Sequence, residues 1–424
     1  MLIERLNRLP KEVLGRVKFI GSVADEMHMN AYVVGGFVRD LLLGAKNNFD
    51  LDIVVEGDGI AFARELSGKL NGRLAHHKAF GTATVVAQDN SKIDIATARK
   101  EIYEFPAALP KVTPGAIKDD LGRRDFSINA MAFGINKNNF GQLIDFYAGN
   151  DDLKAKKVRA LHDLSFIDDP TRILRAARFA ERCNFKISPY TLNLIKQAAS
   201  HKMPEKVSPH RLRDELILIL KENEPVKCVK LVEKICGFSF LHPRLVVDQK
   251  KISSLEKAAK VMKWFEDNFR HKRKVDKWLV YLMLLLEDLP AAEIRKTADR
   301  FAFRSGEIKR MLSFKADCKR AILKLKSELK PSDIHCILDP LSYEVILLIL
   351  LRANNRSVEK NINNFLHHYN EVRILVGGED VKKLGIKPGP HFKKLLKQTF
   401  HAKLDKGLKT KEEELEFLRR KAKR

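Results

Sequence analysis

The pattern of hydrophobic positions divides the chain into two regions. Over roughly the first 150 residues, runs rich in β-branched residues predict strands at 31–34 and 51–59 and a hairpin over 82–98. Helical patterns alternate with these strands, over 11–29 and 60–70. The first region is therefore predicted to be a mixed α/β or α+β head.

From about residue 160 the strand signals fade and helical periodicity dominates. Helices are predicted over 209–222, 254–268, 275–287, 305–327, 342–352 and 357–371. The last stretch, from 377, is a basic helical module. The sequence thus predicts an α+β fold, in which a head with a small mixed β-sheet and helices precedes an elongated all-α region.

Charge adds a class of partner to this picture. The chain has 424 residues, and its 79 Lys and Arg against 54 Asp and Glu give a net charge of +25. Protein surfaces with so strong a positive charge commonly bind polyanions, of which nucleic acid is the most frequent. We therefore expect a nucleic-acid partner.

Cysteine usage and hydropathy indicate a compartment. The five cysteines are an odd number, widely spaced and without a CxxC pair, which favours reduced thiols over disulfides or zinc. The longest apolar run, 278–286, has about half the length that a membrane-spanning helix needs. We expect a cytoplasmic protein without a membrane anchor.

Two carboxylates form the strongest candidate for chemistry. Asp50 and Asp52 are two residues apart on a predicted strand, so their side chains leave the same face. Gly35 and Gly36 open a helix at which phosphate oxygens can approach backbone N–H groups, and Arg39 follows one turn later. Asp94, on the predicted hairpin, would complete a three-carboxylate site for divalent cations.

Two further clusters carry charges. Arg123, Arg124 and Asp125 precede an apolar segment that is predicted to be helical, with Asp125 as an alternative cap for that helix. In the segment DDPTRILRAARFAER, four residues recur at steps of three and share one side of a helix: Asp169, Arg172, Arg175 and Arg178. Such an arginine ridge is suited to phosphate.

Six short motifs together resemble a known family. VGGFVRDLLLG, FDLDIVVEGDG, DIATARKEIYEFPAALP, DLGRRDFSINAMAF, IDFYAG and DPTRILRAARFAERCNF follow one another over roughly residues 31–190. Their order resembles the class II nucleotidyltransferases that build the 3′ end of tRNA, with bacterial poly(A) polymerases as close relatives. The tail resembles some members more weakly.

The resemblance implies a two-metal nucleotidyl transfer. Asp50 and Asp52 would hold two Mg²⁺ ions, with Asp94 as the third catalytic carboxylate, while the RNA 3′-OH attacks the α-phosphate of ATP or CTP. The glycine pair and Arg39 would hold the triphosphate, and Arg124 and Asp125 the nucleotide, Asp125 by accepting a ribose hydroxyl.

The resemblance also assigns base recognition. Asp169 and Arg172 would read the exocyclic amino group and ring acceptor that C and A share, and Arg175 and Arg178 would touch the nucleotide. Two departures stand out. Asp168 occupies a position where many members have Glu, and His210 one where Glu is common.

The implied organisation has four parts: a catalytic head at 1–160, a base-recognising neck at 161–225, a helical body at 226–355 and a tRNA-binding tail at 356–424. The basic body and tail would follow phosphates along the acceptor and TΨC arms of tRNA. The candidate tail contacts are Lys382, Lys383, Lys393, Lys394 and Lys397.

Several activities remain open. Residues 101–118 resemble the flexible segment that enzymes adding only CC are thought to lack, which favours full CCA addition or addition of A alone. Between these two, full CCA addition is the preferred reading because it is the commoner solution in the family. The first alternative is addition of A alone, with a separate CC-adding enzyme. A bacterial poly(A) polymerase is disfavoured because FGTATVV replaces an Arg-rich stretch after Phe80. The last alternative, a catalytically silent RNA-binding protein, leaves the clustered carboxylates unexplained.

Overall fold

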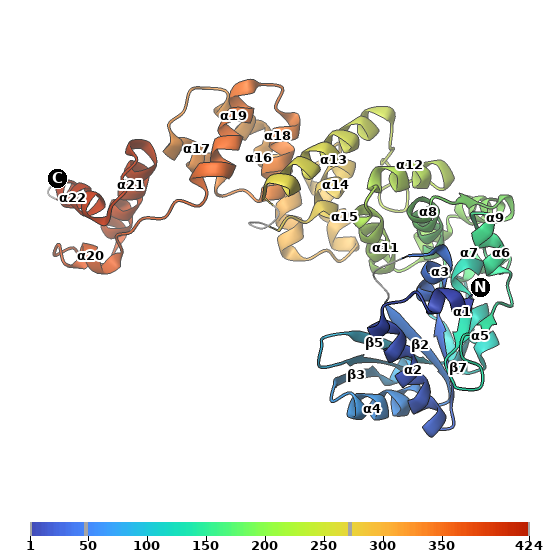
Figure 1. The fold of residues 1–424 in the computed structure, drawn as a ribbon. Helices are drawn as coiled ribbons and strands as arrows, with labels where there is room; N and C mark the ends of the chain where they lie inside the picture. The colour runs from blue at the N-terminus through green and yellow to red at the C-terminus, as the bar shows by residue number, and fades with distance from the viewer. Residues whose placement is uncertain (1, 46–49, 270–273, 423–424) are drawn as a thin grey trace. The chain divides into compact units, whose positions relative to one another are not determined.

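A computed structural model describes residues 2–45, 50–269 and 274–422 (Figure 1). The chain divides into two compact units, Met1–Val246 and Val247–Arg424. The predicted boundary between neck and body, at 225/226, differs from this division, because α12 (Pro225–Ile235) packs on α8 (Thr171–Cys183) and α11 (Pro209–Lys221) inside the first unit.

The first unit is built on a mixed seven-stranded sheet with the order β3-β4-β5-β2-β1-β8-β9. Only β2 and β5 pair in parallel among these strands. The strands are β1 Asn30–Val34, β2 Leu51–Glu56, β3 Arg73–His77, β4 Thr82–Val86, β5 Lys92–Thr97, β8 Ala132–Gly134 and β9 Leu143–Ile144. Two-stranded pairs are β6 Arg99–Ile102 with β7 Lys111–Pro114, and β10 Lys157–Val158 with β11 Lys186–Ile187.

Helices cover both faces of this sheet. On one face lie α2 (Lys11–Glu26), against β1, and α4 (Gly59–Lys69), against β4 and β5. The other face carries α5 (Ile117–Gly122). The remaining helices of the unit are α1 Leu2–Leu6, α3 Gly36–Leu43, α6 Gly149–Lys154, α7 Ser165–Asp168, α9 Pro189–Ser200 and α10 Met203–Lys206.

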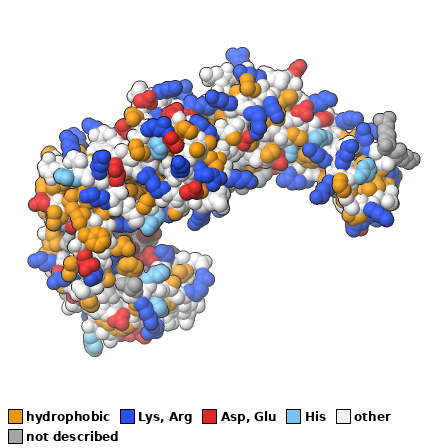
Figure 2. All heavy atoms as spheres, turned by 180° about the vertical axis from the view of Figure 1, so that it is seen from behind, with side chains coloured by type: hydrophobic (Ala, Val, Ile, Leu, Met, Phe, Trp, Pro, Cys, Tyr) orange, Lys and Arg blue, Asp and Glu red, His pale blue; other side chains and the backbone are white. Residues whose placement is uncertain are grey.

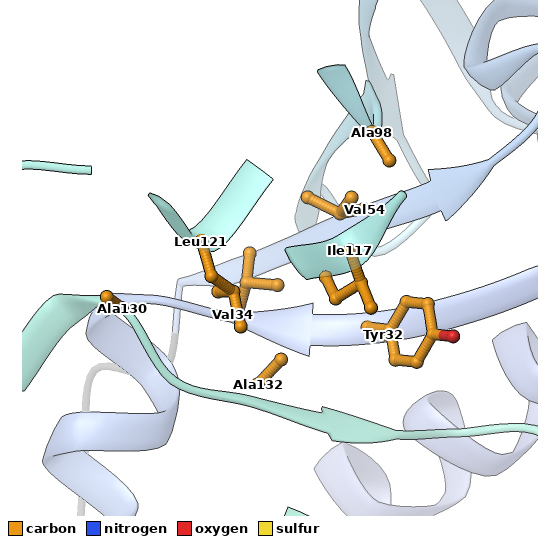
Figure 3. Close-up of a cluster of buried hydrophobic side chains, with 8 residues drawn as sticks. All are labelled: Tyr32, Val34, Val54, Ala98, Ile117, Leu121, Ala130 and Ala132. Atoms are coloured by element: carbon orange, nitrogen blue, oxygen red, sulfur yellow. The ribbon is translucent and has the colours of Figure 1, made fainter. Parts of the chain in front are cut away.

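A small apolar core fixes the face that carries the candidate carboxylates. Ile117 and Leu121 of α5 pack on Val34 and Val54, which project from β1 and β2 (Figure 3). Side chains alternate between the two faces of a strand, so Asp52 leaves the same face as Val54, toward the end of this core. Burial of Val54 therefore fixes the direction of Asp52.

The second unit is helical throughout its described residues. Its helices are α13 Gln249–Phe269, α14 Lys277–Leu286, α15 Ala291–Arg300, α16 Ser305–Leu325, α17 Pro331–Leu338, α18 Tyr343–Arg352, α19 Arg356–Asn364, α20 Gly378–Lys382, α21 Pro390–Lys406 and α22 Lys411–Ala422. The apolar run at 278–286 is the fully buried centre of α14. Val376, Val381, Leu395 and Leu418 form a separate core among α20, α21 and α22.

Surface charge and hydropathy agree with the composition. On the face shown in Figure 2, Lys and Arg side chains are spread widely, with fewer Asp and Glu between them. Within the described ranges, no single helix is long and apolar enough to cross a membrane. Only Pro331–Leu338 and Tyr343–Arg352 taken together reach that length, with a bend of 112° at their break.

One predicted element is wrong. The apolar segment after Asp125 is not a helix: a single 3₁₀ turn at Ser127–Asn129 leads into strand β8. The reason is tertiary, since Phe126 pairs with Ala160 and β8 pairs with β1, which buries the segment on both sides. A short apolar run is compatible with a buried strand as well as a helix.

Candidate active site

A single large cavity of about 830 Å³ collects most of the predicted site residues. It lies within the first unit and is lined by β2, α3, the β6–β7 hairpin, α8 and the segment around 123–129. The predicted residues on its wall are Gly35, Gly36, Arg39, Asp50, Asp52, Arg124, Asp125, Asp169, Arg172 and Arg175.

Asp50 and Asp52 form what we name the carboxylate wall. Asp50 is exposed just before β2 and Asp52 is half-buried within it. Neither carboxylate forms a hydrogen bond or ion pair with any described residue. Burial raises the pKa of Asp52 above its ordinary value, and the charges of Asp94 and Asp50 raise it further, whereas Arg124 lowers it. The charged form of Asp52 is therefore disfavoured in the protein alone, and a bound cation would stabilise it.

Asp94 lies beside this wall but has partners of its own. It is the direct partner of Asp52 in the register of the neighbouring strands β2 and β5. Its carboxylate accepts hydrogen bonds from Thr84 Oγ1 at 2.5 Å and Lys92 Nζ at 3.0 Å. Asp94 does not line the cavity, and the described residues contain no group of three such ligands close enough to hold a metal ion.

The glycine pair shapes the floor of the cavity. Gly35 has a φ of +67°, which places it in the left-handed region that favours glycine. A Cβ at this position would lie 2.6 Å from Arg124 Nη1. Both effects exclude a side chain, so the N–H groups that begin α3 stay accessible from the cavity.

Arg124 and Arg39 line this floor. Arg124 Nη2 donates to Asp120 Oδ2 at 3.0 Å, while its buried Nε has no partner among the described residues. Arg39 is buried, and it donates to Asn129 Oδ1 at 2.7 Å and to both oxygens of Asp40. Protein partners thus hold both guanidinium groups at the wall of the cavity.

Asp125 is the centre of a second charged cluster, which we name the guanidinium network (Asp125, Arg175, Arg178 and Glu215). Asp125 Oδ1 accepts from Phe126 N and Asn129 Nδ2, and Oδ2 accepts from Arg175 Nε and Nη2, at 2.7–3.0 Å. Four donors fill the acceptor capacity of a carboxylate. A ribose hydroxyl would therefore have to displace one of them.

Electrostatics stabilise this network. Burial alone would raise the pKa of Asp125, but Arg175 and the hydrogen bond from Asn129 bring it below its ordinary value. Burial alone would lower the pKa of Arg175, but the neighbouring carboxylates of Asp125 and Glu215 raise it above its ordinary value. Both groups are therefore charged at neutral pH.

Arg178 does not line the cavity, unlike the other predicted arginines. Its Nη2 donates to Glu215 Oε2 at 3.3 Å, and its Nη1 lies 3.6 Å from Glu222 Oε1. Its guanidinium also stacks on the Phe179 ring, with 4.8 Å to the centroid. The structure thus places Arg178 behind Arg175.

Asp169 and Arg172 lie side by side at the start of α8. Asp169 Oδ1 accepts from Thr171 N, Thr171 Oγ1 and Arg211 Nη2, at 2.6–3.1 Å, and its Oδ2 has no partner in the described part of the chain. Arg172 is buried and donates to Ser165 Oγ at 2.9 Å and to the Arg123 carbonyl at 2.7 Å. Both side chains are held rigidly, and Asp169 keeps one acceptor.

The segment 101–118 contains an ordered hairpin, β6 and β7, and the start of α5. Glu101 on β6 accepts from Arg99, Arg123 and Tyr103. Burial and the Glu101 charge raise the pKa of Tyr103 to about 12. The loop between the strands exposes Phe105 (65%) and lines the cavity through residues 103, 109 and 110.

Two family models match the chain. Residues 31–159 match "Poly A polymerase head domain", and residues 184–246 match "Probable RNA and SrmB- binding site of polymerase A". The chain is also 33% identical over 429 residues to the A-adding tRNA nucleotidyltransferase of Halalkalibacterium halodurans, covering 99% of this chain and 95% of that one. This chain belongs to the tRNA nucleotidyltransferase family.

Other similar members differ in length and in named specificity. The A-adding tRNA nucleotidyltransferase of Geobacter sulfurreducens is 36% identical over 98% of this chain, which spans only 48% of that relative. Among solved structures, the Thermotoga maritima CCA-adding enzyme complexed with tRNA has a TM-score of 0.74 and 34% identity, over 98% of this chain and 97% of that one.

Sequence reasoning missed four residues that organise this tRNA nucleotidyltransferase site. Asp120 is fully buried and accepts hydrogen bonds from Arg123 and Arg124. Asn129 accepts a hydrogen bond from Arg39 and donates one to Asp125. On α11, Arg211 pairs with Asp169, and Glu215 pairs with Arg175. Arg211 and Glu215 both belong to the segment SPHRLRDEL, in which only the departure at His210 was predicted to matter. His210 is exposed, and the supporting carboxylate comes from Glu215.

Proposed function

We propose that this chain adds AMP to the 3′ end of tRNA without a nucleic-acid template, with ATP as donor. The carrying observation is that one cavity contains both the carboxylate wall (Asp50, Asp52) and the pair Asp169–Arg172. The first is suited to nucleotidyl transfer and the second to reading a base. A catalytically silent RNA-binding protein does not require the two together.

The carboxylate wall suits Mg²⁺. Hard divalent cations take carboxylate oxygens together with substrate phosphates, and both Asp50 and Asp52 lack other partners among the described residues. When bound there, Mg²⁺ would neutralise charge on the triphosphate and lower the pKa of the RNA 3′-OH. Asp94, held by Thr84 and Lys92, would keep Asp52 in place through strand pairing.

The protein's own groups would orient the nucleotide. The N–H groups at the start of α3 and the guanidinium of Arg124, which lines the cavity, would donate to the triphosphate oxygens. Arg175, held by Asp125 and Glu215, would present its remaining surface to the nucleotide. The triphosphate is thereby bound by donors that need no reorganisation.

Base selection would follow from the open acceptor of Asp169. An adenine N6 amino group can donate to Asp169 Oδ2, whereas the carbonyl of guanine or uracil would leave that half-buried acceptor unpaired. Arg172 would donate to the adjacent ring nitrogen. Cytosine offers the same pattern as adenine, so these residues alone do not separate A from C.

The relatives favour addition of A. Three similar proteins, from Geobacter sulfurreducens, Halalkalibacterium halodurans and Aquifex aeolicus, are named A-adding tRNA nucleotidyltransferases. The second candidate is addition of the whole CCA end. It is favoured by solved CCA-adding enzymes that match over 98% of this chain, one of them in complex with CTP.

Three tRNA transcripts test the proposal. They end at the discriminator base, at C and at CC, and each is offered CTP, ATP or both with Mg²⁺. We expect only the CC-ended transcript to grow, by a single A. Growth of the shortest transcript to a complete CCA end would establish the second candidate instead. Long A tails would indicate a poly(A) polymerase, and no incorporation would contradict both candidates.

A further inference from the structure

A second cavity in the first unit has no role in the reaction described above. It has a volume of about 460 Å³ and lies against the C-terminal halves of α8 and α11, and we name it the α8–α11 cavity. Its wall consists of Arg178, Arg182, Leu218, Lys221, Glu222 and Asn223. Arg182 lines this cavity and the active-site cavity as well, so the two adjoin.

The charge on this wall is predominantly positive. Three cations face one carboxylate, that of Glu222. Neither Arg182 nor Lys221 forms an ion pair or a side-chain hydrogen bond with another residue in the described ranges. Like charges on one cavity wall repel one another, and an anion in the cavity would reduce that repulsion.

Arg178 is buried and only partly satisfied. Its side chain is 8% exposed, yet its Nε has no hydrogen-bond partner within the described chain. Its contact with Glu215 is long, at 3.3 Å, and that with Glu222, at 3.6 Å, exceeds a hydrogen bond. A buried guanidinium with an orphaned donor is rare in folded proteins. This one lies beneath a cavity that an anion can enter.

We propose that the α8–α11 cavity binds a backbone phosphodiester of the RNA primer, close behind its 3′-terminal nucleotide. The inference rests on the proposed function, since the 3′-OH must reach the adjoining active-site cavity. Arginine and lysine are the residues that hold phosphate. None of the described residues that line this cavity is aromatic, so they offer no ring for a base to stack on, whereas exposed Leu218 can contact a ribose.

The first test exchanges a cation that is not part of the active-site cavity. Lys221 is exposed at the end of α11, so Lys221→Gln leaves the fold intact. The matched control is Lys196→Gln, an exposed lysine of α9 that lies outside both cavities and, like Lys221, has no ion pair with a described residue. We expect Lys221→Gln to raise the KM for a CC-ended RNA about fivefold, with the KM for ATP and kcat unchanged. An unchanged KM for RNA, or an equal rise in the control, overturns the proposal.

The second test locates the phosphate. Each of the last three phosphodiesters of the RNA is replaced in turn by a neutral methylphosphonate. For the unmodified protein we expect one position at which the RNA binds about fivefold more weakly. At that position Lys221→Gln should lose no further affinity, because the two changes remove the same interaction. Equal losses at every position in both proteins contradict the proposal.

Direct binding separates this inference from the proposed function. Equilibrium titration of labelled RNA requires no turnover, so it tests the cavity even if the protein adds no nucleotide. Weaker RNA binding by Lys221→Gln alone then supports the cavity while the proposed function fails. Inorganic phosphate or pyrophosphate that binds in a Lys221-dependent manner, with RNA binding unchanged, would make this a site for a free anion and overturn the proposal.

Discussion

Asp50 and Asp52 have no hydrogen-bond partner among the described residues, whereas Asp125, which lines the same cavity, accepts four hydrogen bonds. Burial raises the pKa of Asp52, while Arg175 keeps that of Asp125 low. Burial and neighbouring carboxylates thus destabilise the charged form of the carboxylate wall, whereas ion pairs stabilise the charges of the guanidinium network. The difference separates residues expected to perform the chemistry from residues that position others.

The largest effect is expected from Asp52→Asn. Loss of one wall carboxylate should lower single-turnover AMP addition by at least about 1,000-fold, since charge stabilisation at the reacting centre is lost. RNA binding and the melting temperature should be unchanged or higher, because a buried charge is removed. Retained turnover in this variant would mean that the reaction occurs elsewhere.

Glu215→Gln should have a smaller effect of a different kind. It removes the charge that Arg175 and Arg178 share, at a cost of about 1–3 kcal/mol in the free energy of unfolding. We expect kcat to fall about tenfold with a lower melting temperature. Glu222→Gln, which touches only Arg178, is the matched control. If Glu215→Gln has a normal melting temperature and a normal kcat, the guanidinium network does not position the site residues.

Arg172→Lys tests base selection. The lysine keeps the charge but loses the fork that donates to Ser165 and the Arg123 carbonyl. The preference for ATP over GTP, measured as the ratio of kcat/KM values, should fall about 10- to 100-fold. Arg211→Lys, which weakens the ion pair between Arg211 on α11 and Asp169, should change the ratio of ATP to GTP use less. An unaltered ratio in Arg172→Lys would place base recognition elsewhere.

The smallest effect per residue is expected in the tail. All five predicted lysines are exposed, at positions 382 and 383 by α20 and 393, 394 and 397 on α21. Their joint exchange to Gln should raise the KM for tRNA and reduce its salt dependence, with kcat at saturation retained. A variant with only Lys382 exchanged, which already pairs with Glu379, should be nearly normal. An unchanged affinity for tRNA in the variant with all five lysines exchanged would exclude these tail residues from tRNA binding.

Much of the head was predictable because its signals are local. The alternation in β2 and the hairpin of β4 and β5 are confirmed. The register of β2 and β5, which places Asp94 beside Asp52, was not predicted and comes from the structure. The helix expected after Asp125 was wrong because its apolar residues are buried by partners far along the chain, at Val34 and Ala160. Local periodicity carries no information about such partners.

The guanidinium network shows the same limit for the site. The spacing of Arg172, Arg175 and Arg178 indicated a ridge on one helix face, but it did not show which arginine faces the cavity. That depends on Glu215, which is 40 residues from Arg175 in sequence and contacts it at 2.9 Å. Long-range ion pairs of this kind follow from the packing of α8 on α11 and become visible only in the structure.

The most direct measurement records AMP addition and melting temperature in the same preparations of Asp52→Asn and Glu215→Gln. The account predicts that the first variant loses activity while keeping its melting temperature, and that the second loses stability while keeping part of its activity. If Asp52→Asn instead melts well below the unmodified protein and retains turnover, the carboxylate wall is structural and the central claim is contradicted.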